Sequence, residues 1–320
     1  MTWHLVTTDY PPLDGGIASW AANTAAALKA AGEHVVVYVP RRVGARDAVG
    51  LWGRSWARWA HLWVTGQVLP RVRSGDRVLC ATWPLATALL GRADVSVAFH
   101  GSDLTRPPLV GGLDAIKAGA RLYPVSAFLG GLLGAPHTVL PAAIGPEPMA
   151  ASGSHLLVIA RLGPLKGVDR ALRIAASCGR GVTIVGDGPE REALERLVGD
   201  LGVRAQFTGR LARADIPWDG HHAALLLSRA DPDGSGAEGL GLVLLEAAAR
   251  GIPTVGSTTG GIPEAAMRVL PDGVDELPGF DAEDRERAVA FVRARHGPER
   301  TVGVLRADLT GQRATGVEPA

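Results

Sequence analysis

The chain has 320 residues, of which 47% are hydrophobic and 20% charged, and its formal net charge is +1. This length suffices for two domains of ordinary size, and the balance excludes a disordered chain and a strongly basic nucleic-acid-binding protein. Cys80 and Cys178 have no metal-type or CxxC neighbour, which favours thiols of a reducing compartment. No stretch resembles a signal peptide or a transmembrane helix, so we expect a cytoplasmic protein.

In the first half, short apolar runs alternate with helical patterns, which predicts parallel strands joined by crossover helices. An alanine-rich helix is expected over 19–31, ended by Gly32. Strands are expected at 4–8, 35–39, 78–82 and 95–99, with weaker candidates at 121–126 and 138–141.

Two features of this half lie where ligands bind in such folds, beyond the carboxyl ends of strands. Gly15-Gly16 follows the first strand and lets backbone approach a ligand closely. His100 opens HGSD after the strand at 95–99, a position that raises its odds as a ligand contact over a merely structural histidine. Ser126 is better interpreted as a helix cap.

The second half restarts the alternation after a Pro/Gly/Ala/Ser-rich stretch at 141–154, which predicts a domain boundary. We expect an N-terminal domain over 1–145 and a C-terminal domain over 146–310, with a tail able to pack back on the first domain. Strands are expected at 155–160, 182–186, 204–209, 223–228 and 253–257, and helices at 168–177, 189–201, 282–296 and 298–309.

The segment EGLGLVLLEAAARGIP, residues 238–253, carries two carboxylates eight residues apart. Glu238 lies in a loop broken by Gly239 and Gly241, and Glu246 lies inside a helical stretch. The backbone N–H groups of a helix start bind anions, whereas carboxylates accept hydrogen bonds from vicinal hydroxyls. A phosphate with a sugar at each end satisfies both, so the segment predicts a nucleotide-sugar site.

Two cations follow the strand at 155–160, in RLGPLKG. Arg161 and Lys166 could converge on one diphosphate, although surface charge on a loop is an equally good interpretation. The next glycine turn, GDGP at 186–189, lacks the third glycine of a dinucleotide fingerprint and is better interpreted as a tight strand-to-helix turn. STTGGIPE, residues 257–264, predicts a further flexible turn near the same rim.

RLxxxKG, GDGP, FTG and EGLGLVLLEAAARGIPTVGSTTGGIPE, in this order and spacing, resemble glycosyltransferase family 4. The resemblance is strong over 155–264, moderate at Gly15-Gly16 and HGSD, and poor elsewhere. It implies an α/β chain of the GT-B class, with two Rossmann-like domains whose parallel sheets face across a cleft. Ala142-Ala143 departs from the Asn-Gly pair of many members, and the short first domain weakens any transfer of acceptor identity.

The resemblance also implies roles for individual residues. Arg161 and Lys166 would hold the donor diphosphate, and Glu246 the ribose hydroxyls. The transferred sugar would be held by Glu238 with the backbone of Gly239, Leu240 and Gly241. Backbone near Leu211 would contact the base, His100 the donor sugar, and Gly16 the floor of the cleft. Of these, Glu238, His100, Arg161 and Lys166 are the expected catalytic group.

The implied activity is a retaining glycosyl transfer from a GDP- or UDP-linked sugar to a small-molecule acceptor, without cofactor or metal. Retention would need no protein nucleophile, because the leaving diphosphate takes the acceptor's proton. A lipid acceptor, as in phosphatidylinositol mannosylation, is the alternative within the class. A nucleotide-sugar epimerase is the alternative outside it. The long loop before Glu238 resembles the phosphatidylinositol mannosyltransferase branch and tilts the base towards GDP.

Two further patterns have competing interpretations. Asp231 and Asp233 mimic a metal-binding DxD, but a solvated Gly/Pro loop explains them better, since cations already neutralise the phosphates. Trp52, Trp56, Trp59 and Trp63 form one stripe at helical spacing. Packing in the core is the favoured interpretation of this stripe, ahead of a wall of the acceptor pocket or a helix at a membrane interface.

Overall fold

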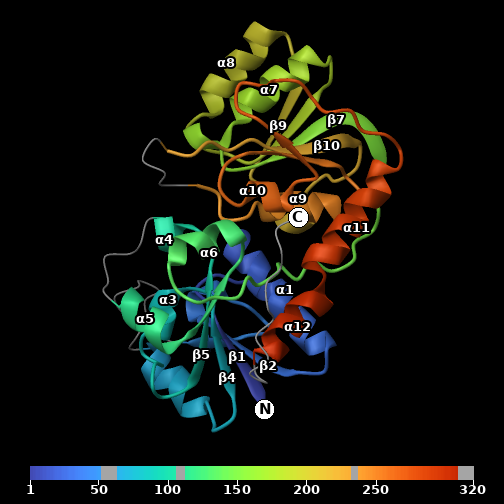
Figure 1. The fold of residues 1–320 in the computed structure, drawn as a ribbon. Helices are drawn as coiled ribbons and strands as arrows, with labels where there is room; N and C mark the ends of the chain where they lie inside the picture. The colour runs from blue at the N-terminus through green and yellow to red at the C-terminus, as the bar shows by residue number, and fades with distance from the viewer. Residues whose placement is uncertain (52–62, 106–111, 232–236, 309–320) are drawn as a thin grey trace. The chain divides into compact units, whose positions relative to one another are not determined.

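The structure, a computed structural model, describes residues 1–51, 63–105, 112–231 and 237–308. The chain forms two compact α/β units (Figure 1). The first contains Met1–Ala143 together with the segment from His296, and the second contains Ile144–Arg295. The boundary therefore lies two residues before the expected end of the first domain at 145. The residues from His296 return to the first unit rather than staying with the second.

The first unit is built on a six-stranded parallel sheet of order β3-β2-β1-β4-β5-β6. The order reverses between β1 and β4, and ligands bind beyond the strand ends at such a point in doubly wound sheets. The strands are β1 (Thr2–Val6), β2 (His34–Pro40), β3 (Val49–Leu51), β4 (Arg77–Cys80), β5 (Asp94–Phe99) and β6 (Arg121–Pro124).

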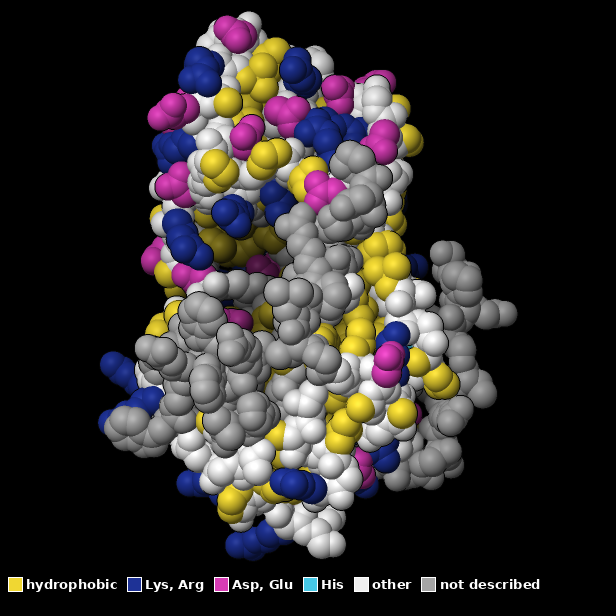
Figure 2. Space-filling model, turned by 90° about the vertical axis from the view of Figure 1, so that its left-hand side faces the viewer, with side chains coloured by type: hydrophobic (Ala, Val, Ile, Leu, Met, Phe, Trp, Pro, Cys, Tyr) yellow, Lys and Arg dark blue, Asp and Glu magenta, His cyan; other side chains and the backbone are white. Residues whose placement is uncertain are grey.

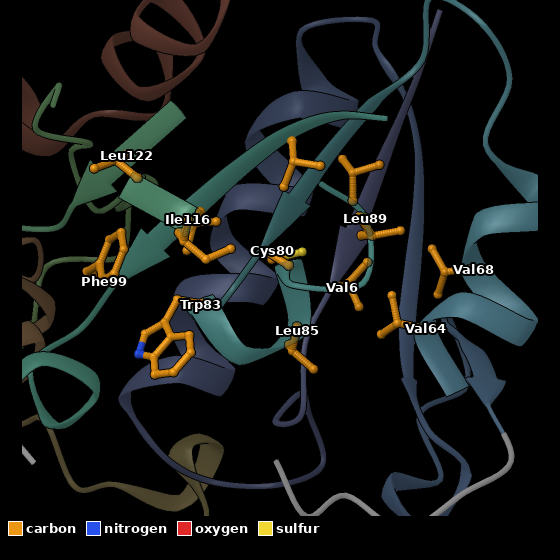
Figure 3. Close-up of a cluster of buried hydrophobic side chains, with 14 of the residues drawn as sticks. Val6, Val64, Val68, Cys80, Trp83, Leu85, Leu89, Phe99, Ile116 and Leu122 are labelled. Atoms are coloured by element: carbon orange, nitrogen blue, oxygen red, sulfur yellow. The ribbon is translucent and has the colours of Figure 1, made fainter. Parts of the chain in front are cut away.

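Apolar side chains from both faces of this sheet meet the helices around it. Figure 3 shows one such cluster, in which Cys80 of β4 and Phe99 of β5 lie among Trp83, Leu85 and Ile116. The helices of the unit are α1 (Gly16–Ala30), α3 (Trp83–Ala86), α4 (Ser102–Thr105), α5 (Leu113–Gly119), α6 (Ala127–Leu133) and α12 (Pro298–Ala307). Ser126 caps α6 as expected, since its Oγ accepts from Leu129 N at 3.2 Å.

The C-terminal helix α12 packs against α1, although nearly 270 residues separate them in the chain (Figure 1). Arg306 donates to the carboxylate of Glu33 at 2.6 Å and to the carbonyl of Ala31 at 2.9 Å. Tyr123 of β6 donates to Asp308 at 2.8 Å. The last described turn of the chain is thus bonded both to the turn after α1 and to β6.

The second unit repeats the same strand order, β12-β11-β10-β7-β8-β9, again entirely parallel. Its reversal lies between β7 and β10. The strands are β7 (Ser152–Ile159), β8 (Val182–Val185), β9 (Ala205–Gly209), β10 (His221–Leu226), β11 (Thr254–Ser257) and β12 (Arg268–Leu270). The helices are α7 (Val168–Ser177), α8 (Arg191–Leu201), α9 (Leu242–Ala248), α10 (Ile262–Ala265) and α11 (Asp284–His296).

Alternate residues of β7 enter two separate cores, one on each face of the sheet. Leu156 and Val158 pack with the α7 and α8 side, whereas Leu157 packs with Ala247 of α9. Figure 2 shows one face of this unit, on which described Lys and Arg side chains are interspersed with Asp and Glu side chains. On that face the charges do not gather by sign, unlike the basic surface of a nucleic-acid-binding protein.

The expected strands and the observed ones differ at three short segments. The strand expected at 138–141 is wrong: the segment donates from Thr138 and Leu140 to β6 at 3.0 and 2.9 Å but forms no ladder. The next N–H in this alternation, that of Ala142, bonds His296 Nδ1 at 3.3 Å instead of β6, and the pairing ends there. The edge strands β3 and β12 have three residues each, too few for a sequence period to reveal.

Only part of the tryptophan stripe lies within the described residues. Trp63 is 4% exposed and packs in the first unit's core with Val64 and Val68, as the core interpretation expects. Trp52, Trp56 and Trp59 lie outside the described residues, as does Asp233 of the DPD sequence. Among the helices that the structure describes, none combines the length and the apolar character needed to cross a bilayer.

Leu305→Ala should destabilise the first unit, because Leu305 of α12 is fully buried and its truncation leaves a cavity. We expect a loss of about 2–5 kcal/mol in the free energy of unfolding, measured by urea titration. Arg300→Ala, at an exposed site on the same helix, is the matched control. An unchanged unfolding curve for Leu305→Ala would show that α12 does not belong to this unit.

Candidate functional site

Most of the residues singled out from the sequence stand on loops at the carboxyl ends of strands in the second unit. Arg161 and Lys166 follow β7, Leu211 follows β9, and Glu238 follows β10. The loops after β7 and β10 flank the point where the strand order reverses, the usual ligand position in this kind of sheet. The fold therefore gathers these residues at one edge.

The loop that carries Lys166 is fixed to the end of β10 by backbone and side-chain contacts. Gly167 has φ +64°, and a Cβ on it would overlap the carbonyl oxygen of Leu227. Arg229 N donates to Leu165 O at 2.7 Å, and the Arg229 guanidinium grips Asp169 through two bonds of 2.8 and 2.9 Å. The pairing with Arg229 contributes to the lowered pKa of Asp169, against the effect of burial. Lys166 thus starts from a backbone that has little freedom.

Lys166 and Glu238, expected to grip different parts of a ligand, contact each other in this structure. Lys166 Nζ donates to Glu238 Oε2 at 2.5 Å, and the two side chains are 34% and 25% exposed. The Glu238 backbone is held from the other side, because Gly261 N donates to its carbonyl at 2.9 Å. Gly260, at φ +61°, lies so close that a Cβ would overlap the same carbonyl. The STTGGIPE turn is therefore a support for Glu238.

The glycine-broken segment after Glu238 leads directly into α9. Gly241, at φ +88°, is the N-cap residue and offers no side chain as a cap. Leu240 and Gly239 are buried beside it. Arg161, in contrast, is exposed on the loop after β7. Its guanidinium is open to solvent, whereas Lys166 shares its charge with Glu238.

Glu246 is buried in α9 and is paired with an arginine that the sequence did not single out. Arg213 Nη1 donates to Glu246 Oε1, and the Glu246 side chain is 8% exposed. Arg213 lies in a short turn two residues after Leu211, which is half-buried against the α9 side of the sheet. Burial lowers the pKa of Arg213, and the nearby Arg250 lowers it further.

Arg250 anchors the other end of the same helix. Its Nη1 donates to the carbonyl oxygen of Glu246 at 2.9 Å, and its Nη2 lies 2.9 Å from a carboxylate oxygen of Glu147. Its guanidinium stacks on the ring of Trp218 at 4.3 Å from the centroid. Each of the two glutamates is therefore paired with an arginine, Glu246 with Arg213 and Glu147 with Arg250.

In the first unit, His100 directly follows β5 and packs edge-to-face on Trp20 of α1, with ring centroids 4.7 Å apart. Its Nε2 is buried and has no hydrogen-bond partner among the described residues. Burial lowers the pKa of His100 to about 4, which a hydrogen bond with the Ala81 backbone only partly opposes. The imidazole is therefore neutral near pH 7.

The turn after His100 is shaped by Asp103. One carboxylate oxygen of Asp103 accepts from His100 N at 3.0 Å and from Gly101 N at 2.9 Å. Gly101, at φ +131°, permits the tight turn. Burial raises the pKa of Asp103, although these backbone N–H groups oppose the shift. Asp103 thus holds the backbone of the HGSD turn in place, a role that the residue types alone did not reveal.

Gly16 begins α1, the helix whose Trp20 contacts His100. Gly15, at φ +149°, is the N-cap of α1, and the helix begins at Gly16 without a side-chain cap or an acidic residue in its first turn. Gly16 is exposed, and Trp20, which contacts His100, stands one turn further along. The first unit therefore presents a bare helix start and a neutral imidazole together.

The structure thus brings Lys166 together with Glu238 in the second unit, and His100 together with Trp20 of α1, the helix that begins at Gly16, in the first. Sequence reasoning missed Arg213, the Arg229–Asp169 pair and Asp103. Asp103 lies within HGSD, and Asp169 lies two residues after RLGPLKG, so the position of each beside a motif was a usable signal. Arg213 and Arg229 act over 33 and 60 residues, and no local pattern indicates such pairs.

His100 should make the first unit sensitive to mild acid. Because its folded pKa of about 4 lies below the ordinary 6.5, protons bind the unfolded state preferentially, and stability falls as pH drops through this window. Between pH 7 and 4.5, the wild type should lose about 2–3 kcal/mol of unfolding free energy that His100→Gln does not lose. His34→Gln, at an exposed site, is the control. Parallel pH profiles for all three proteins would refute this assignment.

Comparison with known proteins connects these geometries to a family. Residues 150–268 match the family model described as glycosyl transferases group 1. Over 156 residues the chain is 36% identical to a GDP-mannose-dependent alpha-(1-6)-phosphatidylinositol monomannoside mannosyltransferase of Mycobacterium tuberculosis. That alignment covers 42% of this chain and 40% of the relative, so the chain matches less than half of the relative's length.

Solved structures show the same fold over almost the whole chain. Anabaena HepE in complex with UDP and glucose has a TM-score of 0.69 at 16% identity, covering 97% of this chain and all of HepE. AviGT4, a glycosyltransferase involved in avilamycin A biosynthesis, has a TM-score of 0.67 at 19% identity, covering 97% and 98%. The expected fold class is therefore confirmed: the chain has the GT-B fold, and residues 150–268 of it match the glycosyl transferases group 1 family.

Proposed function

We propose that the protein is a retaining glycosyltransferase of family 4 that takes its sugar from a nucleotide-diphosphate donor. The observation that carries the proposal is the Lys166–Glu238 contact at the carboxyl edge of the second sheet. It places a cation and a carboxylate within one ligand's reach, inside the segment that matches glycosyl transferases group 1. In a nucleotide sugar, the diphosphate can pair with the cation, and the sugar hydroxyls can donate to the carboxylate.

The two partners would exchange their mutual contact for contacts with the donor. Lys166 would turn its three donors to the diphosphate, joined by the exposed fork of Arg161. Glu238 would then accept from sugar hydroxyls, with the backbone of Gly239, Leu240 and Gly241 beside it. Both side chains are partly exposed, so the exchange requires no burial of an unpaired charge.

The remaining assignments concern single residues of each unit. Glu246 would accept from the ribose hydroxyls, and the backbone near Leu211 would contact the base. From the first unit, Gly16 would line the floor of the site and His100 would contact the donor sugar. A neutral imidazole suits a neutral sugar, because it can donate to or accept from a hydroxyl without bringing a charge.

In the reaction, the bond from the sugar's anomeric carbon to the phosphate oxygen breaks, and a bond from that carbon to the acceptor oxygen forms on the same face. The acceptor's proton passes to the leaving diphosphate, so no protein nucleophile is needed. Negative charge builds up on the leaving diphosphate, and positive charge develops on the sugar ring. Lys166 and Arg161 stabilise the first, and Glu238 stabilises the second.

For the nucleotide, we infer GDP ahead of UDP. The support is the loop before Glu238 together with the relative that is named as GDP-mannose-dependent. The donor sugar would then be mannose. For the acceptor, we propose a small molecule, such as a natural-product or glycoconjugate intermediate. The second candidate is a phosphatidylinositol-type lipid, which the same relative's name favours.

Lys166→Ala and Glu238→Ala should each reduce sugar transfer by about 100-fold or more, the usual scale for losing one preorganised charge at a transition state. Turnover of GDP-mannose is measured with phosphatidylinositol mannosides and with small-molecule acceptors in parallel. Lys29→Ala, at an exposed site in α1, is the matched control and should retain full activity. Near-normal transfer by either variant would contradict the role assigned to the residue that it replaces.

The nucleotide assignment predicts that GDP raises the melting temperature of the protein more than UDP does. Transfer should continue in EDTA and should give a product with the donor's anomeric configuration, read by NMR. A larger shift with UDP would reverse the assignment of the base. Inversion would contradict the retaining mechanism, and C2 epimerisation of the donor without any acceptor would identify an epimerase instead.

A further inference from the structure

Arg213 has no role in the proposed reaction, yet it contacts the carboxylate assigned to the ribose. It stands in the turn after β9, in the same loop as Leu211, the residue assigned to the base. The Glu246 side chain is 8% exposed and that of Arg213 is 34% exposed. A buried carboxylate is thus covered on one side by a cation that reaches solvent.

The charge of Glu246 needs this partner. A buried carboxylate left unpaired is costly, and the other nearby cation is engaged elsewhere. Arg250 Nη2 pairs with Glu147, its Nη1 bonds the backbone carbonyl of Glu246, and its plane stacks on Trp218. Arg250 therefore braces the helix. Among the described residues, Arg213 is the cation on the carboxylate itself.

We propose that Arg213 is a positioning residue for the nucleotide's ribose. Arg213 holds Oε1 of Glu246 and so orients the carboxylate, leaving Oε2 to accept from a ribose hydroxyl. A carboxylate offers about four lone-pair sites, so an arginine and a sugar hydroxyl can share it. The planar guanidinium also fixes the plane of the carboxylate better than a point charge would.

This inference rests on the proposed function, because it requires a nucleotide donor. It also opposes a specific rival, in which Arg213 occupies the place of the ribose and must leave before the donor binds. The two hypotheses predict opposite effects of Arg213 on the binding of the ribose. A positioning arginine strengthens the binding of ribose hydroxyls, whereas a competing arginine weakens it.

The test compares GDP with 2′,3′-dideoxy-GDP, which lacks both ribose hydroxyls, by isothermal titration calorimetry. The wild type should prefer GDP. In Arg213→Ala this preference should fall about tenfold, equivalent to about 1.4 kcal/mol, while the affinity for the dideoxy compound changes little. Arg213→Lys should recover part of the preference, since it restores the charge. Arg287→Ala, an exposed arginine paired with carboxylates on α11, is the matched control.

Two results would overturn the inference. Tighter or unchanged GDP binding in Arg213→Ala would identify a competing or idle side chain. An equal loss of affinity for both nucleotides would show a general effect of Arg213→Ala on the fold. Arg213→Lys, which keeps the charge, then serves as the second variant, expected to fold, on which the preference for GDP is measured. If the wild type binds UDP instead, the uridine pair of ligands replaces the guanosine pair. Binding of neither diphosphate to the wild type would contradict the proposed function itself.

Discussion

The contact between Lys166 and Glu238 is the interaction on which the account of the site depends. Ion pairs this exposed contribute about 0–1 kcal/mol to stability, so this one does not hold its two loops together. The loops hold the pair. Arg229 and Gly167 fasten the lysine loop to the end of β10, and Gly260 and Gly261 fasten the glutamate. The backbone thus presents two opposite charges whose separation costs little free energy.

The two units share one strand order but carry different residues at the corresponding edge. Each sheet reverses its order between a central pair of strands, and each carries a glycine turn near that edge. In the second unit the edge bears charged side chains, among them Lys166 and Glu238. In the first unit it bears Gly16 and His100, a bare helix start and a neutral imidazole.

The alternating strands and helices were predictable because apolar runs and glycine turns are local signals. The motifs RLGPLKG and EGLGLVLLEAAARGIP likewise located Lys166, Glu238 and Glu246. The pairing of Lys166 with Glu238 was not predictable, because 72 residues separate them. Arg213 was missed for the same reason, since only the packing of the β9 turn on α9 brings it to Glu246. Three-residue strands such as β3 and β12 were not predicted, because they contain too few residues to show a period of hydrophobic side chains.

The measurement that tests the central claim most directly is a comparison of GDP and GDP-mannose affinities in Lys166→Ala and Glu238→Ala. If the lysine takes the diphosphate and the glutamate the sugar, Lys166→Ala weakens the binding of both ligands. Glu238→Ala should then weaken only GDP-mannose, and leave GDP bound as in the wild type or more tightly. Equal losses of both ligands in both variants would contradict the division of roles.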